Sequence, residues 1–341
     1  MSTILDAMKC QNNGRVPVWF MRQAGRYLPE YMEIKKRSNF REMSHTPELM
    51  KEITLQPMKR YDLDAAIMFS DILTCLEYMG APFQFTDTGP KLSSAGPEAL
   101  TSLTELDPPR DLSFVGEGLS LIKKELTDKP VLGFIGAPFT LASYLIEGGT
   151  SREFIHTRRF MLSEPKVFQR ALNHLADQLA KYIDYQIDCG VSALQVFDSW
   201  GGILPKEQYE EFVLPSLQRL YEKTTKKVPF IQYGQPTSHL MKLYCSLPIN
   251  VLSVDWRLSV GKYAKLAAGY GRKDICLQGN IDPIVMSLKP EQAKPYIQRV
   301  LDSAKEAEIL NRFVLNVGHG VTPLTNTDTV KMAIDLAHSL R

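Results

Sequence analysis

The sequence predicts an α/β fold, namely a single-domain (β/α)8 TIM barrel with its active-site cleft at the C-terminal ends of the strands. Short apolar runs bounded by turn residues occur eight times along the 341 residues, and several are apolar at consecutive positions, as strands buried on both faces are. Helical patterns separate many of these runs, and such alternation builds right-handed βα units around a parallel sheet. A count of eight favours closure into a barrel over an open, doubly wound sheet.

The predicted elements follow one another along the chain. The strands are predicted at 17–22, 65–69, 130–136, 193–198, 228–233, 251–256, 276–281 and 313–317. The clearest helix is predicted over 165–189, where apolar residues recur at steps of three and four and Gly190 marks the end. Further helices are predicted over 207–224, 290–308 and 327–340. The proline-rich stretch 70–129 is predicted to be an insertion between the second and third strands, and 1–341 to be one domain.

Composition places the chain among soluble globular proteins, since 44% of its residues are hydrophobic and 23% are charged. The formal net charge of +2 is too balanced for general attraction to nucleic acid or to a membrane, so neither is expected as a partner. Five scattered cysteines without a Cys-x-x-Cys pair favour a reducing, cytoplasmic location. The charge is uneven, however, because residues 1–60 hold eleven basic and six acidic residues, a local excess of +5.

Candidate site residues are those that follow each apolar run, because a βα barrel builds its active site there. The first run ends in Arg22, and Arg26 follows shortly after it. Their spacing of four would turn both the same way if the segment were helical, and forked guanidinium groups suit carboxylates or phosphates. Asp71 follows the second run, and His319 follows the last, between two glycines that would let the backbone approach a ligand or adopt positive φ.

Each of these residues also has a purely structural interpretation. The arginines could be solvated surface charges, Asp71 could be the N-cap of the next helix, and a lone histidine is more often packed than catalytic. Ser199 follows the fourth run without a Gly-x-Ser-x-Gly motif, so hydrogen bonding is expected of it rather than nucleophilic attack. Tyr144 lies in the glycine-rich segment 133–149, which is predicted to be a shaped loop rather than a plain helix, and could equally be a core residue.

The motifs indicate neither a nucleotide cofactor nor a metal. The chain has no Walker loop, and the glycines at 269 and 271 do not follow a strand with the spacing of a dinucleotide-binding fingerprint. Its six histidines form no His-Glu-x-x-His pattern and no His-x-Cys pair. We therefore expect an activity without a cofactor and without a metal site.

Two longer segments resemble the signatures of a known family. The segment PVWFMRQAGRYLPEY at 17–31 resembles the N-terminal signature of the uroporphyrinogen decarboxylases, and GFIGAPFTLASYLIEGG at 133–149 resembles their second signature. Four shorter blocks keep the family's order along nearly the whole chain: IMFSDIL at 67–73, QVFDSW at 195–200, LQGNIDP at 277–283 and LNVGHG at 315–320. The resemblance implies a (β/α)8 barrel, usually a homodimer, that uses no cofactor.

The resemblance also implies an activity, which is the loss of carbon dioxide from the four acetate side chains of uroporphyrinogen III to give coproporphyrinogen III in haem biosynthesis. Asp71 would be the central group, accepting hydrogen bonds from pyrrole N–H groups and stabilising the cation formed when a pyrrole carbon is protonated. Such a ring is an electron sink, and an ionised carboxylate in a water-poor cleft stabilises the cation well. The octaanionic substrate would match the basic excess of residues 1–60.

The other residues take their implied roles from the matching motif positions. Arg22 and Arg26 would bind substrate carboxylates, with Arg22 near the reacting acetate. Tyr144 and Ser199 would hydrogen-bond that acetate, and His319 would contact another substrate carboxylate. The residues implied to line the cleft are Gln23, Ile67 and Phe197.

Two other functions are weighed against this one. A corrinoid-linked methyltransferase has the same fold, but its zinc needs a His-x-Cys arrangement that the sequence lacks. A tetrapyrrole carrier would bind without reacting, and the combination of Arg22, Asp71, Tyr144 and His319 argues against it.

Overall fold

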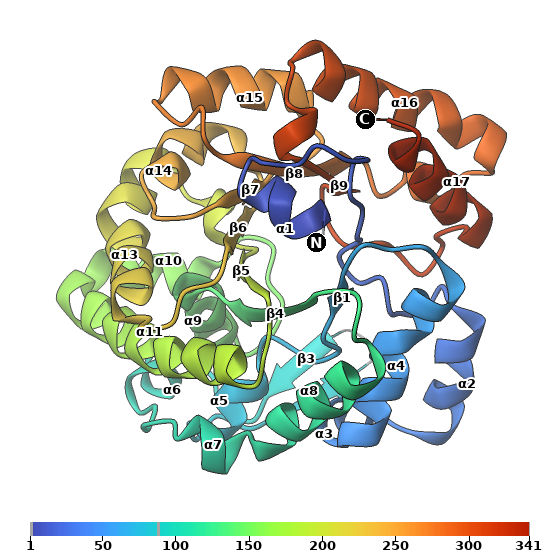
Figure 1. The fold of residues 1–341 in the computed structure, drawn as a ribbon. Coiled ribbons are helices and arrows are strands. Elements are labelled where there is room, and N and C mark those ends of the chain that lie inside the picture. Colours follow the sequence, from blue (N-terminus) through green and yellow to red (C-terminus); the bar gives the residue numbers. More distant parts are fainter. Residues whose placement is uncertain (1–2, 87–88, 341) are drawn as a thin grey trace.

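A computed structural model of the chain describes residues 3–86 and 89–340. Seven strands form one sheet in the order β1-β4-β5-β6-β7-β8-β9, every neighbouring pair is parallel, and helices surround the sheet as in a βα barrel (Figure 1). The strands are β1 (Ala66–Ile67), β4 (Val131–Gly136), β5 (Ala193–Asp198), β6 (Phe230–Gly234), β7 (Val251–Ser253), β8 (Cys276–Ile281) and β9 (Phe313–Val317). All seven lie within predicted runs, apart from the last residue of β6.

The first predicted strand, 17–22, takes the eighth position of the barrel but is much shorter than predicted. Val18 forms a parallel bridge with Leu315 of β9, and its carbonyl accepts a 2.9 Å hydrogen bond from Asp64 N just before β1. The next backbone amides bond to side chains instead: Phe20 N donates to Gln23 Oε1 at 3.0 Å and Met21 N to Asn316 Oδ1 at 3.0 Å. The segment therefore closes the gap between β9 and β1 and then turns away from the sheet.

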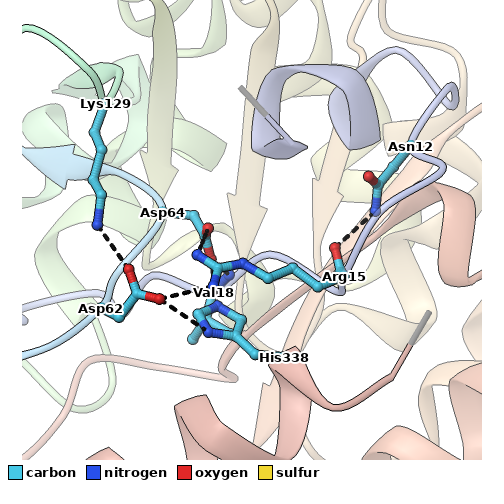
Figure 2. A network of polar contacts seen from close by, with 7 residues as sticks. All are labelled: Asn12, Arg15, Val18, Asp62, Asp64, Lys129 and His338. Atoms are coloured by element: carbon cyan, nitrogen blue, oxygen red, sulfur yellow. Dashed lines mark hydrogen bonds and ion pairs between the residues drawn. The ribbon is translucent and has the colours of Figure 1, made fainter. Parts of the chain in front are cut away.

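Charged side chains hold this closing segment at the N-terminal ends of the strands (Figure 2). Asp64, just before β1, is 6% exposed. Its carboxylate accepts hydrogen bonds from Val18 N at 2.8 Å and Arg15 at 2.9 Å, and lies 2.8 Å from His338 Nε2. Asp62 forms a 2.7 Å ion pair with the same Arg15. The network thus joins the chain start, the approach to β1 and the last helix.

The barrel interior contains a buried polar layer that was not predicted. Trp19 Nε1 donates a 2.8 Å hydrogen bond to Gln278 Oε1. The amide nitrogen of Gln278 donates to Gln195 at 3.0 Å and to Ser253 at 3.1 Å. All four side chains are fully buried. Since hydrogen bonds offset much of the cost of burying amides, the layer links the closing segment to β5, β7 and β8.

Helices cover the outside of the barrel, while α1 lies across its opening at the N-terminal ends of the strands (Figure 1). The helices are α1 (Thr3–Met8), α2 (Pro29–Arg37), α3 (Phe40–His45), α4 (Pro47–Arg60), α5 (Thr74–Tyr78), α6 (Pro97–Thr101), α7 (Pro108–Asp111), α8 (Ser113–Glu125), α9 (Pro138–Glu147), α10 (Ile155–Ser163), α11 (Pro165–Asp188), α12 (Lys206–Gln208), α13 (Leu214–Lys223), α14 (Met241–Cys245), α15 (Val260–Gly269), α16 (Pro290–Glu306) and α17 (Thr327–His338). In the described part of the chain, no helix combines the length and apolar character needed to cross a membrane.

The predicted helices are present, with one interruption. α11 confirms the helix at 165–189, and Gly190 follows it with φ of 96°, the left-handed geometry of a helix stop. α16 and α17 confirm the helices at 290–308 and 327–340. The helix predicted at 207–224 is broken by a π-helical turn at Tyr209–Val213.

The stretch 70–129 is an insertion only in part. It contains α5, the hairpin of β2 (Phe83–Thr86) and β3 (Gly89–Leu92), and the short helices α6 and α7. Its last part is α8, which packs against α4 outside the barrel and leads into β4 (Figure 1). α8 is therefore a regular barrel helix that the many prolines upstream concealed.

The prediction of a shaped loop at 133–149 is wrong. The segment is the end of β4 followed directly by the regular helix α9. Ala137 is extended, Pro138 occupies the first turn of the helix, where its missing N–H costs nothing, and Gly148 ends the helix with φ of 75°. The glycines and the proline thus mark the boundaries of two regular elements.

Candidate active site

The cleft residues predicted from the sequence come together at the C-terminal ends of the strands. Arg22, Asp71, Tyr144 and His319 come from four separate segments, and the charge of Arg22 shifts the pKa of each of the other three. Since such an effect requires proximity, Arg22 lies at the centre of the group. The structure therefore brings these four residues together, as the strand-end argument predicted for Arg22, Asp71 and His319 and as the resemblance implied for Tyr144.

Asp71 lies in the turn between β1 and α5. Its Oδ1 accepts a 2.8 Å hydrogen bond from Leu73 N. Burial raises the pKa of Asp71 to about 6, although this hydrogen bond and the charge of Arg22 both favour the carboxylate. The carboxylate is thus mostly ionised at neutral pH; it closes the turn before α5 and lies within reach of the charge of Arg22.

Arg22 has an unusual backbone conformation, with φ of 63°. Hydrogen bonds on both sides hold it there: Met21 N donates to Asn316 Oδ1 at 3.0 Å, and Gln23 N donates to Phe20 O at 2.9 Å. A non-glycine residue with positive φ costs free energy, and such strain is concentrated at functional sites. Here the fixed turn sets the direction in which the Arg22 side chain leaves the backbone.

The structure buries Gln23 and leaves Arg26 exposed. Gln23 is fully buried; its amide nitrogen donates to Ala65 O at 3.1 Å and its Oε1 accepts from Phe20 N. It therefore fixes the turn. Arg26 is exposed and lies close enough to Tyr31 to lower the pKa of that hydroxyl, which burial raises. Because the segment is a series of turns, the helical spacing expected of the two arginines is absent.

Tyr144 is placed by α9 and is 9% exposed. The centroid of its ring lies 5.9 Å from the centroid of the Trp200 ring. Burial and, to a smaller extent, the charge of Asp71 raise the pKa of Tyr144 to about 12, although Arg22 opposes the shift. The hydroxyl is therefore a stable hydrogen-bond donor near the Asp71 carboxylate at neutral pH.

His319 follows β9 and is partly exposed, with its ring edge-on to Tyr233 at a centroid distance of 6.3 Å. Burial and, to a smaller extent, the charge of Arg22 lower the pKa of His319 to about 4. The imidazole is consequently neutral at pH 7 and offers hydrogen bonds rather than charge.

The two glycines beside His319 do not have the positive φ suggested by the sequence. They are needed for close packing. A Cβ on Gly318 would lie 2.8 Å from Cε3 of Trp256, and a Cβ on Gly320 would lie 2.8 Å from Cγ of Arg22. The His319 turn is therefore pressed between Trp256 and Arg22.

The remaining predicted residues lie on strands of the barrel or in the turn that follows one. Ile67 is on β1, four residues before Asp71, and is 8% exposed. Phe197 is on β5 and packs edge-on against Tyr233 at 5.5 Å, which connects it to the His319 ring. Ser199 is partly exposed in the turn after β5.

A buried carboxylate next to this turn supports it. Asp198 is fully buried at the end of β5 and accepts hydrogen bonds from the hydroxyls of Tyr209 at 2.5 Å, Tyr244 at 3.2 Å and Thr140 at 3.4 Å. Burial raises its pKa to about 6, while these donors favour the charged form. Thr140 also accepts a 3.3 Å hydrogen bond from Trp200 N. Nothing in the sequence links these tyrosines to Asp198, so sequence reasoning gave Asp198 no role.

The basic excess of residues 1–60 is not a substrate-binding surface as a whole. Seven of its eleven basic side chains form ion pairs with carboxylates: Arg15, Lys36, Arg37, Arg41, Lys51, Lys59 and Arg60. Most of these pairs lie on the helices outside the barrel. Of the predicted cationic side chains, Arg22 is the one whose charge acts on Asp71, Tyr144 and His319.

Comparisons with known proteins agree with the fold and with the sequence motifs. A family model described as uroporphyrinogen decarboxylase (URO-D) matches residues 1–340. The uroporphyrinogen decarboxylase of Bacillus pumilus is 39% identical over 340 residues, which cover 98% of this chain and 94% of that protein. That of Thermodesulfovibrio yellowstonii is 39% identical over 334 residues, covering 95% and 94%.

Among solved structures, a methyltransferase from Methanosarcina mazei is similar with a TM-score of 0.82, covering 99% of this chain and 97% of that one. At 17% identity this likeness concerns the fold alone. It confirms the TIM-barrel architecture and leaves the chemistry to the side chains. Since the family model spans nearly the whole sequence and the relatives match over almost their full length, the chain belongs to the uroporphyrinogen decarboxylase family.

Proposed function

We propose that the protein decarboxylates the four acetate side chains of uroporphyrinogen III to methyl groups, giving coproporphyrinogen III in tetrapyrrole biosynthesis. The observation that carries this proposal is that the buried Asp71 carboxylate lies near enough to Arg22 for that charge to lower its pKa, in a chain from this family. The substrate carries carboxylates before the reaction and a cationic ring during it. It therefore needs both a cationic and an anionic side chain. The proposal includes no cofactor.

The proposed chemistry balances without an added oxidant or reductant. A proton adds to a carbon of the pyrrole ring and makes the ring cationic. The acetate then loses carbon dioxide, and the electron pair of the broken C–C bond flows into the ring. A second proton converts the resulting methylene to methyl, and the ring proton is released, so that each acetate consumes one proton in total. The Asp71 carboxylate stabilises the cationic ring electrostatically and accepts hydrogen bonds from the pyrrole N–H groups.

The other side chains bind and orient the substrate in this proposal. Arg22 holds the reacting acetate, and Tyr144 and Ser199 donate hydrogen bonds to it. His319 acts as a neutral hydrogen-bonding group for another carboxylate, because its pKa of about 4 leaves it uncharged at pH 7. Arg26 binds a carboxylate at the exposed edge. Ile67 and Phe197 supply apolar surface to the tetrapyrrole, and Gln23 acts through the Arg22 turn.

We also propose that residues 1–341 act as one domain, in a cytoplasmic homodimer without nucleic-acid or membrane partners. Analytical ultracentrifugation measures the oligomeric state directly. A single species with twice the mass of the chain is expected, and a monomer at micromolar concentration would contradict the dimer.

The proposed activity is tested by anaerobic incubation of chelator-treated protein with uroporphyrinogen III, followed by separation of the products by their number of carboxylates. Stepwise appearance of hepta-, hexa-, penta- and tetracarboxylate species is expected. Binding without any product would identify a tetrapyrrole carrier instead. A requirement for added zinc would favour the corrinoid-linked methyltransferase chemistry.

A further inference from the structure

A second arginine that sequence reasoning missed lies at the C-terminal end of the barrel. The predicted strand at 251–256 ends early, because β7 stops at Ser253. The residues Asp255 to Arg257 therefore form a loop at the end where the cleft residues lie. The Arg257 side chain is 45% exposed, and its guanidinium carbon lies 4.9 Å from the ring centroid of Trp256.

Buried hydrogen bonds fix this loop. The amide nitrogen of Asn280 donates to Asp255 O at 2.8 Å and to Leu258 O at 2.7 Å. The Asp255 carboxylate, which is fully buried, accepts from Thr237 N at 2.8 Å and from Arg257 N at 2.8 Å. Because bonds from both ends hold the backbone, Arg257 extends from a rigid support, as a binding residue requires.

The loop packs directly against the His319 turn. A Cβ on Gly318 would lie 2.9 Å from Trp256 N, so these two backbone segments touch. Burial lowers the pKa of His319, and the charges of both Arg22 and Arg257 lower it further. The same two charges also act on Tyr233, where they oppose the rise that burial causes in the pKa of the hydroxyl. Both arginines are therefore close to the same pair of rings.

The Arg257 guanidinium keeps donors available for a ligand. Arginines on the outside of the barrel commit theirs, since Arg219 donates two 2.7 Å hydrogen bonds to Asp177. Arg257 approaches Asp255 Oδ2 at 3.3 Å, but that carboxylate already accepts two backbone hydrogen bonds and a third from Tyr263 at 3.0 Å. A half-exposed, loosely paired guanidinium on a rigid loop is suited to bidentate binding of a carboxylate.

We propose that Arg257 binds a carboxylate of the tetrapyrrole substrate, on the side of the cleft formed by His319 and Tyr233. The inference rests on the proposed function, because a polycarboxylate substrate is what gives a second cation a ligand. Arg257 would then share the substrate with Arg22, with the neutral His319 between their charges. The role is one of binding, so its loss affects affinity more than the chemical step.

The test compares steady-state kinetics of the wild type with Arg257→Gln and Arg257→Lys. Arg299→Gln is the matched control, because Arg299 is an exposed arginine stacked on Tyr296 at 5.4 Å on α16. We expect Arg257→Gln to raise KM for uroporphyrinogen about tenfold, because it loses a charge-assisted hydrogen bond to the substrate. The kcat should change less than about threefold. Arg257→Lys keeps a positive charge beside Asp255 and should raise KM about threefold.

Salt dependence separates binding from a structural role. The KM difference between Arg257→Gln and wild type should shrink as ionic strength rises, because salt screens the lost attraction. An unchanged KM in Arg257→Lys and Arg257→Gln, with active wild type and Arg299→Gln, would overturn the inference and leave the proposed function standing. If Arg257→Gln does not fold, the Arg257→Lys result decides. Wild type without any product would overturn the proposed function, and this inference with it.

Discussion

The side chain of Arg22 fills the space directly beside Gly320, where an added Cβ would lie 2.8 Å from Cγ of the arginine. The backbone turn at φ of 63° sends the side chain along this path. Gly320 is thus required by the arginine that follows the first predicted strand, although the two residues are almost 300 positions apart. This contact connects the two ends of the chain at the cleft.

Gly320→Ala should therefore damage activity more than stability. The added methyl group collides with a flexible side chain rather than with backbone, so the fold can keep its form while Arg22 moves. A misplacement of about 1 Å can cost about 100-fold in rate, and we expect kcat/KM to fall by about that factor. Gly269→Ala is the control, because a Cβ there meets nothing within 4 Å. Equal kcat/KM for the two variants would contradict the contact's importance.

The pH dependence of kcat/KM should show an acidic limb near pH 6. Burial holds the pKa of Asp71 at about 6, and its carboxylate must be ionised to stabilise the cationic ring. Activity is expected to fall as pH drops through this value. Asp198 has a similar pKa, so Tyr209→Phe serves as the control: it removes a 2.5 Å hydrogen bond that lowers the pKa of Asp198. The limb should stay in place, and a shift to higher pH in this variant would assign it to Asp198 instead.

Asp71→Asn should stabilise the fold above pH 6 while it removes activity. The pKa of Asp71 is raised from 3.8 to about 6, so burial penalises the charged form and wild type carries this cost above pH 6. Asparagine keeps the oxygen that accepts from Leu73 N without the charge. We expect a gain of about 1–2 kcal/mol at pH 8, allowing for partial exposure of the side chain. The gain should vanish below about pH 4, and urea unfolding at both pH values checks this. A loss of stability at pH 8 would contradict the prediction.

Asp64→Asn should destabilise the protein without changing the cleft. Breaking a buried ion pair typically costs about 3 kcal/mol, and Asp64 is 6% exposed between Arg15 and His338. Burial alone would raise the pKa of Asp64, but its hydrogen bonds, led by that with His338, bring it below the usual value. The stabilisation is therefore present above about pH 4, the unfolded value, and is lost as pH falls further.

Urea unfolding at pH 7 and pH 3 measures this contribution. Asp274→Asn is the control, since Asp274 forms an exposed ion pair with Arg272 and should change stability by less than about 1 kcal/mol. The kcat of Asp64→Asn at low temperature should match wild type. Equal stability of the two variants at pH 7 would show that the network does not hold the barrel closed.

Most of the barrel could be predicted from the sequence because its strands are short runs buried on both faces. β5, β8 and β9 begin and end where their apolar runs do. The strands predicted at 17–22 and 251–256 are too long, since apolar composition does not show where a strand stops pairing with its neighbour. The backbone amide of Phe20 donates to the side chain of Gln23 and not to a neighbouring strand.

The site could be predicted in composition but not in arrangement. The strand-end argument found Asp71 and His319, because the fold itself brings those positions together. It could not show that Gln23 is buried or that Arg26 is exposed, since the segment forms turns from Met21 onward instead of a helix. Arg257 directly follows the run at 251–256 and so fits the strand-end argument, but it was missed because it lies in none of the segments that resemble the family.

The most direct test of the central claim is anaerobic turnover of uroporphyrinogen III by wild type and by Asp71→Ala, both treated with chelator. We expect wild type to convert the octacarboxylate stepwise to the tetracarboxylate. Asp71→Ala should give less than about one thousandth of that rate, because no neighbouring group replaces the charge that stabilises the cationic ring. Near-normal turnover by Asp71→Ala, in protein that unfolds like wild type, would contradict the proposed chemistry.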